Sequence, residues 1–127
     1  MEAKVRKMCL ALPEATEKEA WGTPTFRVKD KMFAMWTDAD SHNGKGNEAV
    51  WIKSDSDNQQ LMISLEPKRY FSPPYMGPSG WVGVYCNAKT DWKQVEALLR
   101  DAWTAIAPKK LRQMHEGRTT ARRKAKA

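Results

Sequence analysis

The chain has 127 residues and a mass of 14.5 kDa, and 41% of its residues are hydrophobic. This length fits one domain with a core of modest size, and the longest uncharged apolar run is far below the roughly 18 residues that a membrane span needs. The N-terminal residues MEAKVRKMCLALPE carry charges in every turn, which is not the pattern of a signal peptide. We therefore expect a soluble, cytoplasmic protein with no membrane partner.

The formal net charge of +7 comes entirely from the C-terminal residues. Residues 108–127 contain eight Lys or Arg side chains and one acidic side chain, whereas residues 1–107 contain 14 of each kind. The final residues, GRTTARRKAKA, interleave the cations with Thr and Ala and show no apolar stripe. The sequence thus predicts one domain over residues 1–107 and a basic extension over residues 108–127 that is at least partly mobile.

The first third of the chain predicts a helix followed by a hairpin. Apolar residues recur at the spacing of one helical face from Glu2 to Leu12, and Pro13 ends this helix. The period then changes to two residues, which predicts strands over residues 25–28 and 31–36. A tight turn at Lys29–Asp30–Lys31 joins these strands.

The next segment, from Asp38 to Asn47, is polar and contains glycine, so we expect a loop, followed by a third strand from Ala49 to Lys53. Side chains of a strand alternate between its two faces. In the strand before the loop, this alternation puts on one face Phe33 and Met35, and on the other Ala34 and Trp36.

The second half of the chain predicts a helix, a strand and a second helix. Ser54 or Asp55 is suited to cap a short helix, and the loop after it contains four prolines that exclude regular structure. Alternation from Gly80 to Asn87 predicts a fourth strand. An amphipathic helix begins near Thr90–Asp91 and ends or kinks at Pro108.

The predicted order of elements, α-β-β-β-α-β-α, favours an α+β fold. Consecutive strands with short links form antiparallel neighbours, and each helix has one apolar stripe to bury. We expect a two-layer sandwich in which helices cover one face of an antiparallel sheet. Most of the six tryptophans fall on the predicted apolar faces and are expected in the core, whereas Trp21 is expected to cover one end of the sheet.

Three segments of the chain carry a family resemblance: LPEATEKEAWGTPTFRVKDKMFAMW, YFSPPYMGPSGWVGVY and DAWTAIAPKKL. They resemble the MmcQ/YjbR family of small bacterial proteins, over roughly Val5 to Leu111. The resemblance implies a CyaY-like fold and binding of DNA. It also implies two projecting hairpin-like elements that straddle a duplex, here the Lys29–Asp30–Lys31 turn and the Asp38–Asn47 loop with Lys45.

Double-stranded DNA is therefore the expected partner, bound through its phosphates without strong sequence specificity. Each Lys or Arg that neutralises a phosphate releases condensed counterions, so the basic extension is expected to supply most of the affinity and the hairpin tips the orientation. The alternative is that the extension only solubilises the chain. The expected DNA-binding residues are Arg27, Lys29, Lys31, Lys45, Lys109, Lys110, Arg112, Arg118, Arg122, Arg123 and Lys124.

A second reading of the sequence is a module that binds a small ligand or a protein partner. Aromatic residues surround the proline-rich loop at residues 66–81, and a long loop beside a sheet edge is a common place for a ligand site. The residues of this alternative pocket are Tyr70, Phe71, Tyr75 and Trp81.

No motif indicates an enzyme, a metal or a cofactor. The segment DADSHNG lacks the sixth-position glycine of a calcium loop, and His42 and His115 have no zinc-ligand spacing. The segment Gly77–Gly80 lacks the spacing of a serine nucleophile motif. Cys9 and Cys86 are expected as small buried hydrophobes. We expect a monomeric, non-enzymatic protein without a cofactor.

Overall fold

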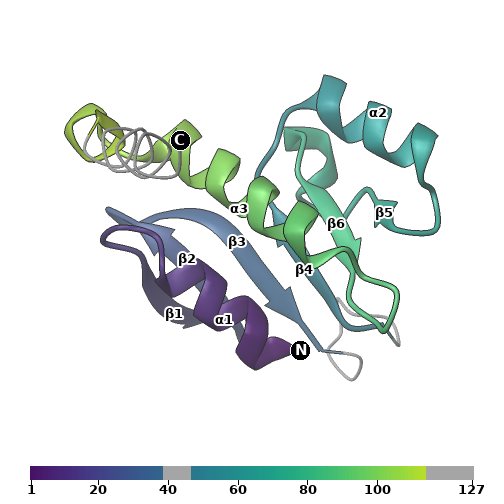
Figure 1. Cartoon of the computed structure of the whole chain (residues 1–127), viewed down its shortest axis with the longest axis horizontal. Coiled ribbons are helices and arrows are strands. Elements are labelled where there is room, and N and C mark those ends of the chain that lie inside the picture. Colours follow the sequence, from purple (N-terminus) through teal and green to yellow (C-terminus); the bar gives the residue numbers. More distant parts are fainter. Residues whose placement is uncertain (39–46, 114–127) are drawn as a thin grey trace, which may run out of the picture.

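The computed structural model describes residues 1–38 and 47–113. Figure 1 shows the arrangement of the helices and strands. In chain order the elements are α1 (Glu2–Leu10), β1 (Thr16–Ala20), β2 (Thr23–Val28), β3 (Lys31–Thr37), β4 (Ala49–Ile52), α2 (Ser56–Leu65), β5 (Tyr70–Phe71), η1 (Gly77–Ser79), β6 (Val82–Tyr85) and α3 (Trp92–Ile106).

The strands form one antiparallel sheet of six, in the order β1-β2-β3-β4-β6-β5. Helices α1 and α3 lie across the same face of this sheet (Figure 1), which confirms the predicted α+β fold. The sheet has two strands more than the sequence predicts. Strand β1, with the sequence TEKEA, is almost entirely exposed, so it shows no apolar alternation and joins the sheet through its backbone. Strand β5 is only two residues long.

A β-bulge in the β2–β3 hairpin changes which side chains reach the core. Phe26 pairs with Ala34 and Arg27 pairs with Met32, so Phe33 is the extra residue on β3. Phe33 and Ala34 consequently both belong to the cluster on the helix side, together with Trp36. The prediction that Phe33 lies on the face opposite Ala34 is therefore wrong, because strict alternation stops at a bulge.

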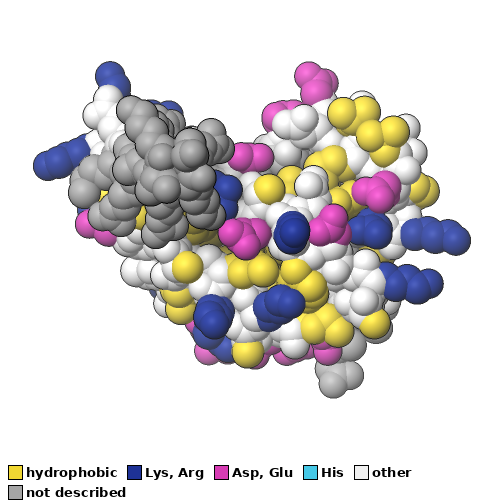
Figure 2. Space-filling view, in the orientation of Figure 1, with side chains coloured by type: hydrophobic (Ala, Val, Ile, Leu, Met, Phe, Trp, Pro, Cys, Tyr) yellow, Lys and Arg dark blue, Asp and Glu magenta, His cyan; other side chains and the backbone are white. Residues whose placement is uncertain are grey.

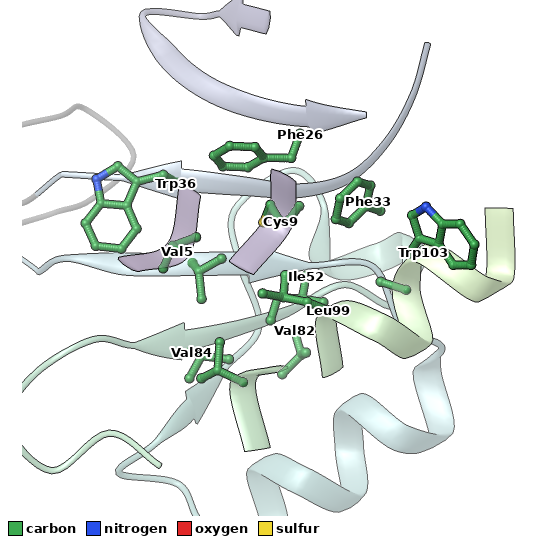
Figure 3. Packing of buried hydrophobic residues seen from close by; sticks show 14 of the residues in the cluster. Val5, Cys9, Phe26, Phe33, Trp36, Ile52, Val82, Val84, Leu99 and Trp103 are labelled. Atoms are coloured by element: carbon green, nitrogen blue, oxygen red, sulfur yellow. The ribbon is translucent and has the colours of Figure 1, made fainter. Parts of the chain in front are cut away.

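The core between the helices and the sheet draws on both ends of the chain (Figure 3). Val5 and Cys9 of α1 are completely buried, as is Trp103 of α3. The indole Nε1 of Trp103 donates a hydrogen bond of 3.0 Å to the carbonyl oxygen of Pro13, in the turn after α1. Each fully buried aliphatic or aromatic side chain contributes about 1.5–3 kcal/mol. This packing fixes α1, the turn after it and α3 on the sheet.

A smaller apolar cluster covers part of the other face of the sheet. It contains Met35 and Trp51 of adjacent strands and Trp81 of the proline-rich loop. Phe71 pairs with Gly83 across β5 and β6, and its ring lies where a side chain at Gly83 would be. The loop thus forms a partial second layer on the face that α1 and α3 leave uncovered.

Aspartate side chains cap the N-termini of α2 and α3, as the sequence predicts. The carboxylate of Asp55 accepts a hydrogen bond of 2.8 Å from the backbone N–H of Asn58, and Asp91 accepts one of 3.2 Å from that of Gln94. Each such cap satisfies an otherwise unpaired N–H of the first turn and contributes about 1 kcal/mol. Pro108 follows the end of α3, and residues 109–113 are helical again.

Both cysteines are free thiols in the interior, as expected. Burial raises the pKa of Cys9 and raises that of Cys86 to about 12. An unfolded thiol ionises near pH 8.5–9 while a buried one keeps its proton. Burial of the thiols therefore stabilises the fold fully below pH 9, and this contribution is lost as the pH rises toward 12.

We expect Cys86→Ala to reduce the alkaline loss of stability. Between pH 9 and 11, the free energy of unfolding of the variant should fall less steeply than that of the wild type, by up to about 1.4 kcal/mol per pH unit. Urea unfolding at several pH values measures both slopes. Equal slopes would show that the Cys86 thiol does not keep its proton in the folded state.

Candidate nucleic-acid interface

The tight turn between β2 and β3 is present where the sequence predicts it. Lys29 and Asp30 occupy its two central positions with φ angles of 50° and 65°, as in a type I′ turn. The Nζ of Lys29 lies 3.2 Å from a carboxylate oxygen of Glu14, so this charge is partly neutralised. Lys31, the first residue of β3, is exposed. At this turn, Lys31 is the lysine that forms no ion pair with another described residue.

Arg27 lies on the sheet surface and not at the tip of the hairpin. Its Nε donates a hydrogen bond of 3.1 Å to the hydroxyl oxygen of Thr25 on the same strand, and its side chain is half-buried. Thr16 of β1 is its cross-strand neighbour. This position therefore does not favour the expected role of Arg27 in orienting a duplex together with the turn.

The helical residues 109–113 attach to the body of the domain. Leu111 packs against the main core, whereas Lys109 and Lys110 are exposed. Arg112 is half-buried, and its Nε is buried and has no hydrogen-bond partner among residues 1–38 and 47–113. A buried donor without a partner costs free energy that an anionic acceptor would recover. The first part of the expected basic extension is thus a fixed surface.

Packing brings these cations to the same end of the molecule as the β2–β3 turn. The last turn of α3 is bonded to Pro13 through Trp103, and the next residue, Glu14, pairs with Lys29. In Figure 1 the end of α3 and the β2–β3 turn lie at the left, and Figure 2 shows Lys and Arg side chains projecting there. We call Lys31, Lys109 and Lys110 the basic end. None of these three forms an ion pair within the described part of the chain.

Most of the second expected tip, residues 39–46, lies outside the described residues. Asp38, which precedes it, follows the end of β3, about 20 Å from Lys31 at 3.3 Å per residue. Among the expected DNA-binding residues, those outside the described residues are Lys45, Arg118, Arg122, Arg123 and Lys124.

The four residues of the alternative pocket do not surround one cavity. Tyr70 belongs to the core under the helices, whereas Phe71 and Trp81 belong to the cluster on the other face. They separate because neighbouring residues of a strand point to opposite faces. Tyr75, at the tip of the loop, is 79% exposed.

Trp21 projects into solvent, so the prediction that it covers the end of the sheet is wrong. It is 71% exposed and lies, with Gly22, at the centre of the turn between β1 and β2. Both residues have positive φ angles, of 53° and 73°. The unpredicted strand β1 explains the error, because it turns this segment into a hairpin tip.

Within residues 1–38 and 47–113, no group of three or more His, Cys, Asp or Glu side chains is arranged to hold a metal ion. None of the helices in this part of the chain has the length and apolar character to cross a membrane. The fold therefore defines a small α+β domain whose described cations include three unpaired lysines at one end.

The sequence profile of the YjbR family matches residues 10–105, and the chain belongs to this family. Among solved structures, the chain is similar to Deinococcus radiodurans protein DR2400, which contains a domain named DUF419. The two share 18% sequence identity with a TM-score of 0.72, over 86% of this chain and 80% of that one. This similarity shows the fold. No curated protein matches the chain.

Proposed function

We propose that the protein binds the phosphate backbone of double-stranded DNA through the basic end and the basic residues that follow it. The observation that carries the proposal is that Lys31, Lys109 and Lys110 lie at the same end of the molecule, and that none of them forms an ion pair with another described residue. The excess charge of the whole chain begins at the same place, since residues 108–127 carry it all. The proposed protein is a cytoplasmic monomer.

Binding of this kind is electrostatic and carries no base readout. Each phosphate that a cation neutralises lowers the slope of log K against log salt by about 0.9, so the basic end alone contributes a slope of about −2.7. Lysine is suited to this role because it offers a point charge on a flexible stem. Phosphate contacts orient a protein on a duplex without specifying its sequence.

The proposed function involves no catalysis. The described groups with shifted pKa values are the thiols, Tyr70 and Arg6. Burial in the core raises the pKa values of the two thiols and of Tyr70, and the hydrogen bond with Glu17 raises the pKa of Arg6. None of these described groups is a shifted acid or base positioned in a cleft for proton transfer to a ligand.

A protein-partner module is the second candidate, and the geometry of Tyr75 favours it. This exposed side chain has a φ of 64°, which is uncommon for an aromatic residue, on a loop that Gln59 holds in place. The side chain of Gln59 is buried and donates hydrogen bonds of 3.0 and 2.6 Å to the carbonyl oxygens of Gly77 and Trp81. A rigid, exposed aromatic residue is typical of an interface anchor.

We expect the triple variant Lys31→Gln, Lys109→Gln, Lys110→Gln to bind a random duplex at least about tenfold more weakly than wild type near 100 mM salt. Its salt slope should be smaller by about 2.7. Fluorescence anisotropy with a labelled duplex across a salt series measures both quantities.

The matched control removes three other exposed lysines, in the variant Lys68→Gln, Lys89→Gln, Lys93→Gln. It has the same net charge as the first variant, so a general effect of charge would weaken both equally. The proposal requires the control to stay within about threefold of wild type. Equal losses in the two variants, or no binding by wild type, would overturn it.

A further inference from the structure

A groove of about 490 Å³ lies between α1 and α3. Its floor is apolar and is formed by Met8, Leu12 and Leu99. Three cations line its rim: Lys4 and Lys7 from α1, and Arg100 from α3. Figure 2 shows apolar side chains in the seam between the two helices, with Lys and Arg side chains beside them.

The orientation of α1 is fixed, so the groove is a lasting feature of this surface. Val5 and Cys9 on one side of the helix are completely buried in the core. Arg6 donates two hydrogen bonds, of 2.7 and 3.0 Å, to the carboxylate of Glu17 on β1. These contacts direct the remaining side of α1, with Lys4 and Lys7, toward the groove.

The rim has a net positive charge. Glu96 is the one acidic side chain among the lining residues, and its carboxylate already accepts a hydrogen bond of 3.0 Å from Arg100. The Nζ of Lys4 lies 4.7 Å from the centre of the Trp92 ring, which holds this cation at one end of the groove. Lys7 is exposed and has no ion-pair partner in the described part of the chain.

An apolar floor between helices with charged edges is complementary to an amphipathic helix. Such helices bind by placing apolar residues at i, i+3, i+4 and i+7 into a groove while polar residues face its rim. Because the rim is basic, the flanking residues of the occupant should be acidic. The C-terminal residues of this chain do not fit, since residues 114–127 carry five basic side chains and one acidic one.

We infer that the groove between α1 and α3 is a docking site for an acidic amphipathic helix of a partner protein. Apolar side chains of the partner cover Met8 and Leu12, the partly exposed residues of the floor. A carboxylate of the partner pairs with Lys7.

The test uses a labelled synthetic helix of about 14 residues, with Leu at i, i+3, i+4 and i+7 and Glu at the flanking positions. Fluorescence anisotropy measures its affinity for the full chain. We expect Lys7→Glu, which reverses a rim charge, and Ala11→Tyr, which fills the groove beside Leu12, each to weaken binding about tenfold. Lys89→Glu makes the same charge change at an exposed site elsewhere and should leave the affinity within about twofold.

Control ligands separate this inference from its rivals. A peptide with Ser in place of Leu should bind at least about tenfold more weakly, because it cannot cover the floor of the groove. Equal binding of that peptide, equal effects of Lys7→Glu and Lys89→Glu, or no binding of the acidic helix would overturn the inference. Displacement of the helix by dodecanoate would assign the groove to a small anionic amphiphile, and displacement by duplex DNA would assign it to nucleic acid. Either result would also overturn it.

Discussion

A chain that ends at Gln113 is expected to bind a DNA duplex about a hundredfold more weakly than the full chain near physiological salt. The truncation removes five basic side chains and one acidic side chain, and it retains Lys109, Lys110 and Leu111. Ending the chain at this position keeps the packing of Leu111 on the core, so the fold and the basic end are preserved. The salt slope should decrease by about 4.5 if all five cations contact phosphates.

Two companion variants separate charge from chain length. Full-length protein with Arg118, Arg122, Arg123, Lys124 and Lys126 replaced by Gln should bind as weakly as the truncated chain. Replacing the three arginines by Lys should leave the affinity within about threefold of wild type, since a phosphate contact needs mainly the charge. Thermal unfolding of each variant checks that the domain is intact. A truncated chain that keeps the full salt slope would show that the C-terminal residues only solubilise the protein.

The elements that the sequence predicts well are those with a strong local signal. Helix α1 ends two residues before the predicted end, and Asp55 and Asp91 cap their helices as expected. Strand β1 gives no such signal, because its exposed side chains TEKEA neither alternate nor bury apolar surface. A strand that has no apolar face is not detected by a hydrophobic pattern.

The bulge at Phe33 is a second case in which local pattern is insufficient. The segment KMFAMWT has apolar residues at both odd and even positions, so its sequence does not fix which side chains face the core. The pairing of β2 with β3 decides this. By adding one residue, the bulge lets both Phe33 and Ala34 face the helices. Side-chain faces beyond a bulge follow from pairing and core packing, which a single strand does not encode.

Sequence identifies the cations of the candidate site but not their meeting point. Lys31 and Lys109 are far apart along the chain and lie at the same end of the molecule because α3 packs on the sheet with Trp103 bonded to Pro13. That contact is a tertiary one, so no spacing rule reveals it. Tyr70 and Phe71 are adjacent in the sequence, but they lie on opposite faces of the sheet because side chains alternate along a strand. The sequence does not predict strand β5, so it does not predict this separation.

Gly80→Ala is expected to destabilise the domain strongly, with a loss of about 3 kcal/mol in the free energy of unfolding. Two costs add at this position. The residue has a φ of 90°, which side chains other than glycine rarely adopt. A Cβ there would also lie 2.8 Å from the backbone Cα and carbonyl carbon of Asp55 and from the N of Ser56. Backbone atoms cannot rotate away, so the start of α2, with its Asp55 cap, must move.

Gly22→Ala is the matched control, because it shares the first cost and lacks the second. Gly22 has a φ of 73°, and among the described residues no atom beyond its two chain neighbours lies within 4 Å of the Cβ that the substitution would add. The expected loss is about 1 kcal/mol. Urea unfolding of the two variants therefore isolates the steric term at Gly80, expected near 2 kcal/mol. Equal losses would mean that α2 moves away from Gly80 at little cost, and that the contact between α2 and the proline-rich loop is loose. A large difference would show that this contact is rigid, which is what an exposed Tyr75 on the same loop requires in order to act as an anchor.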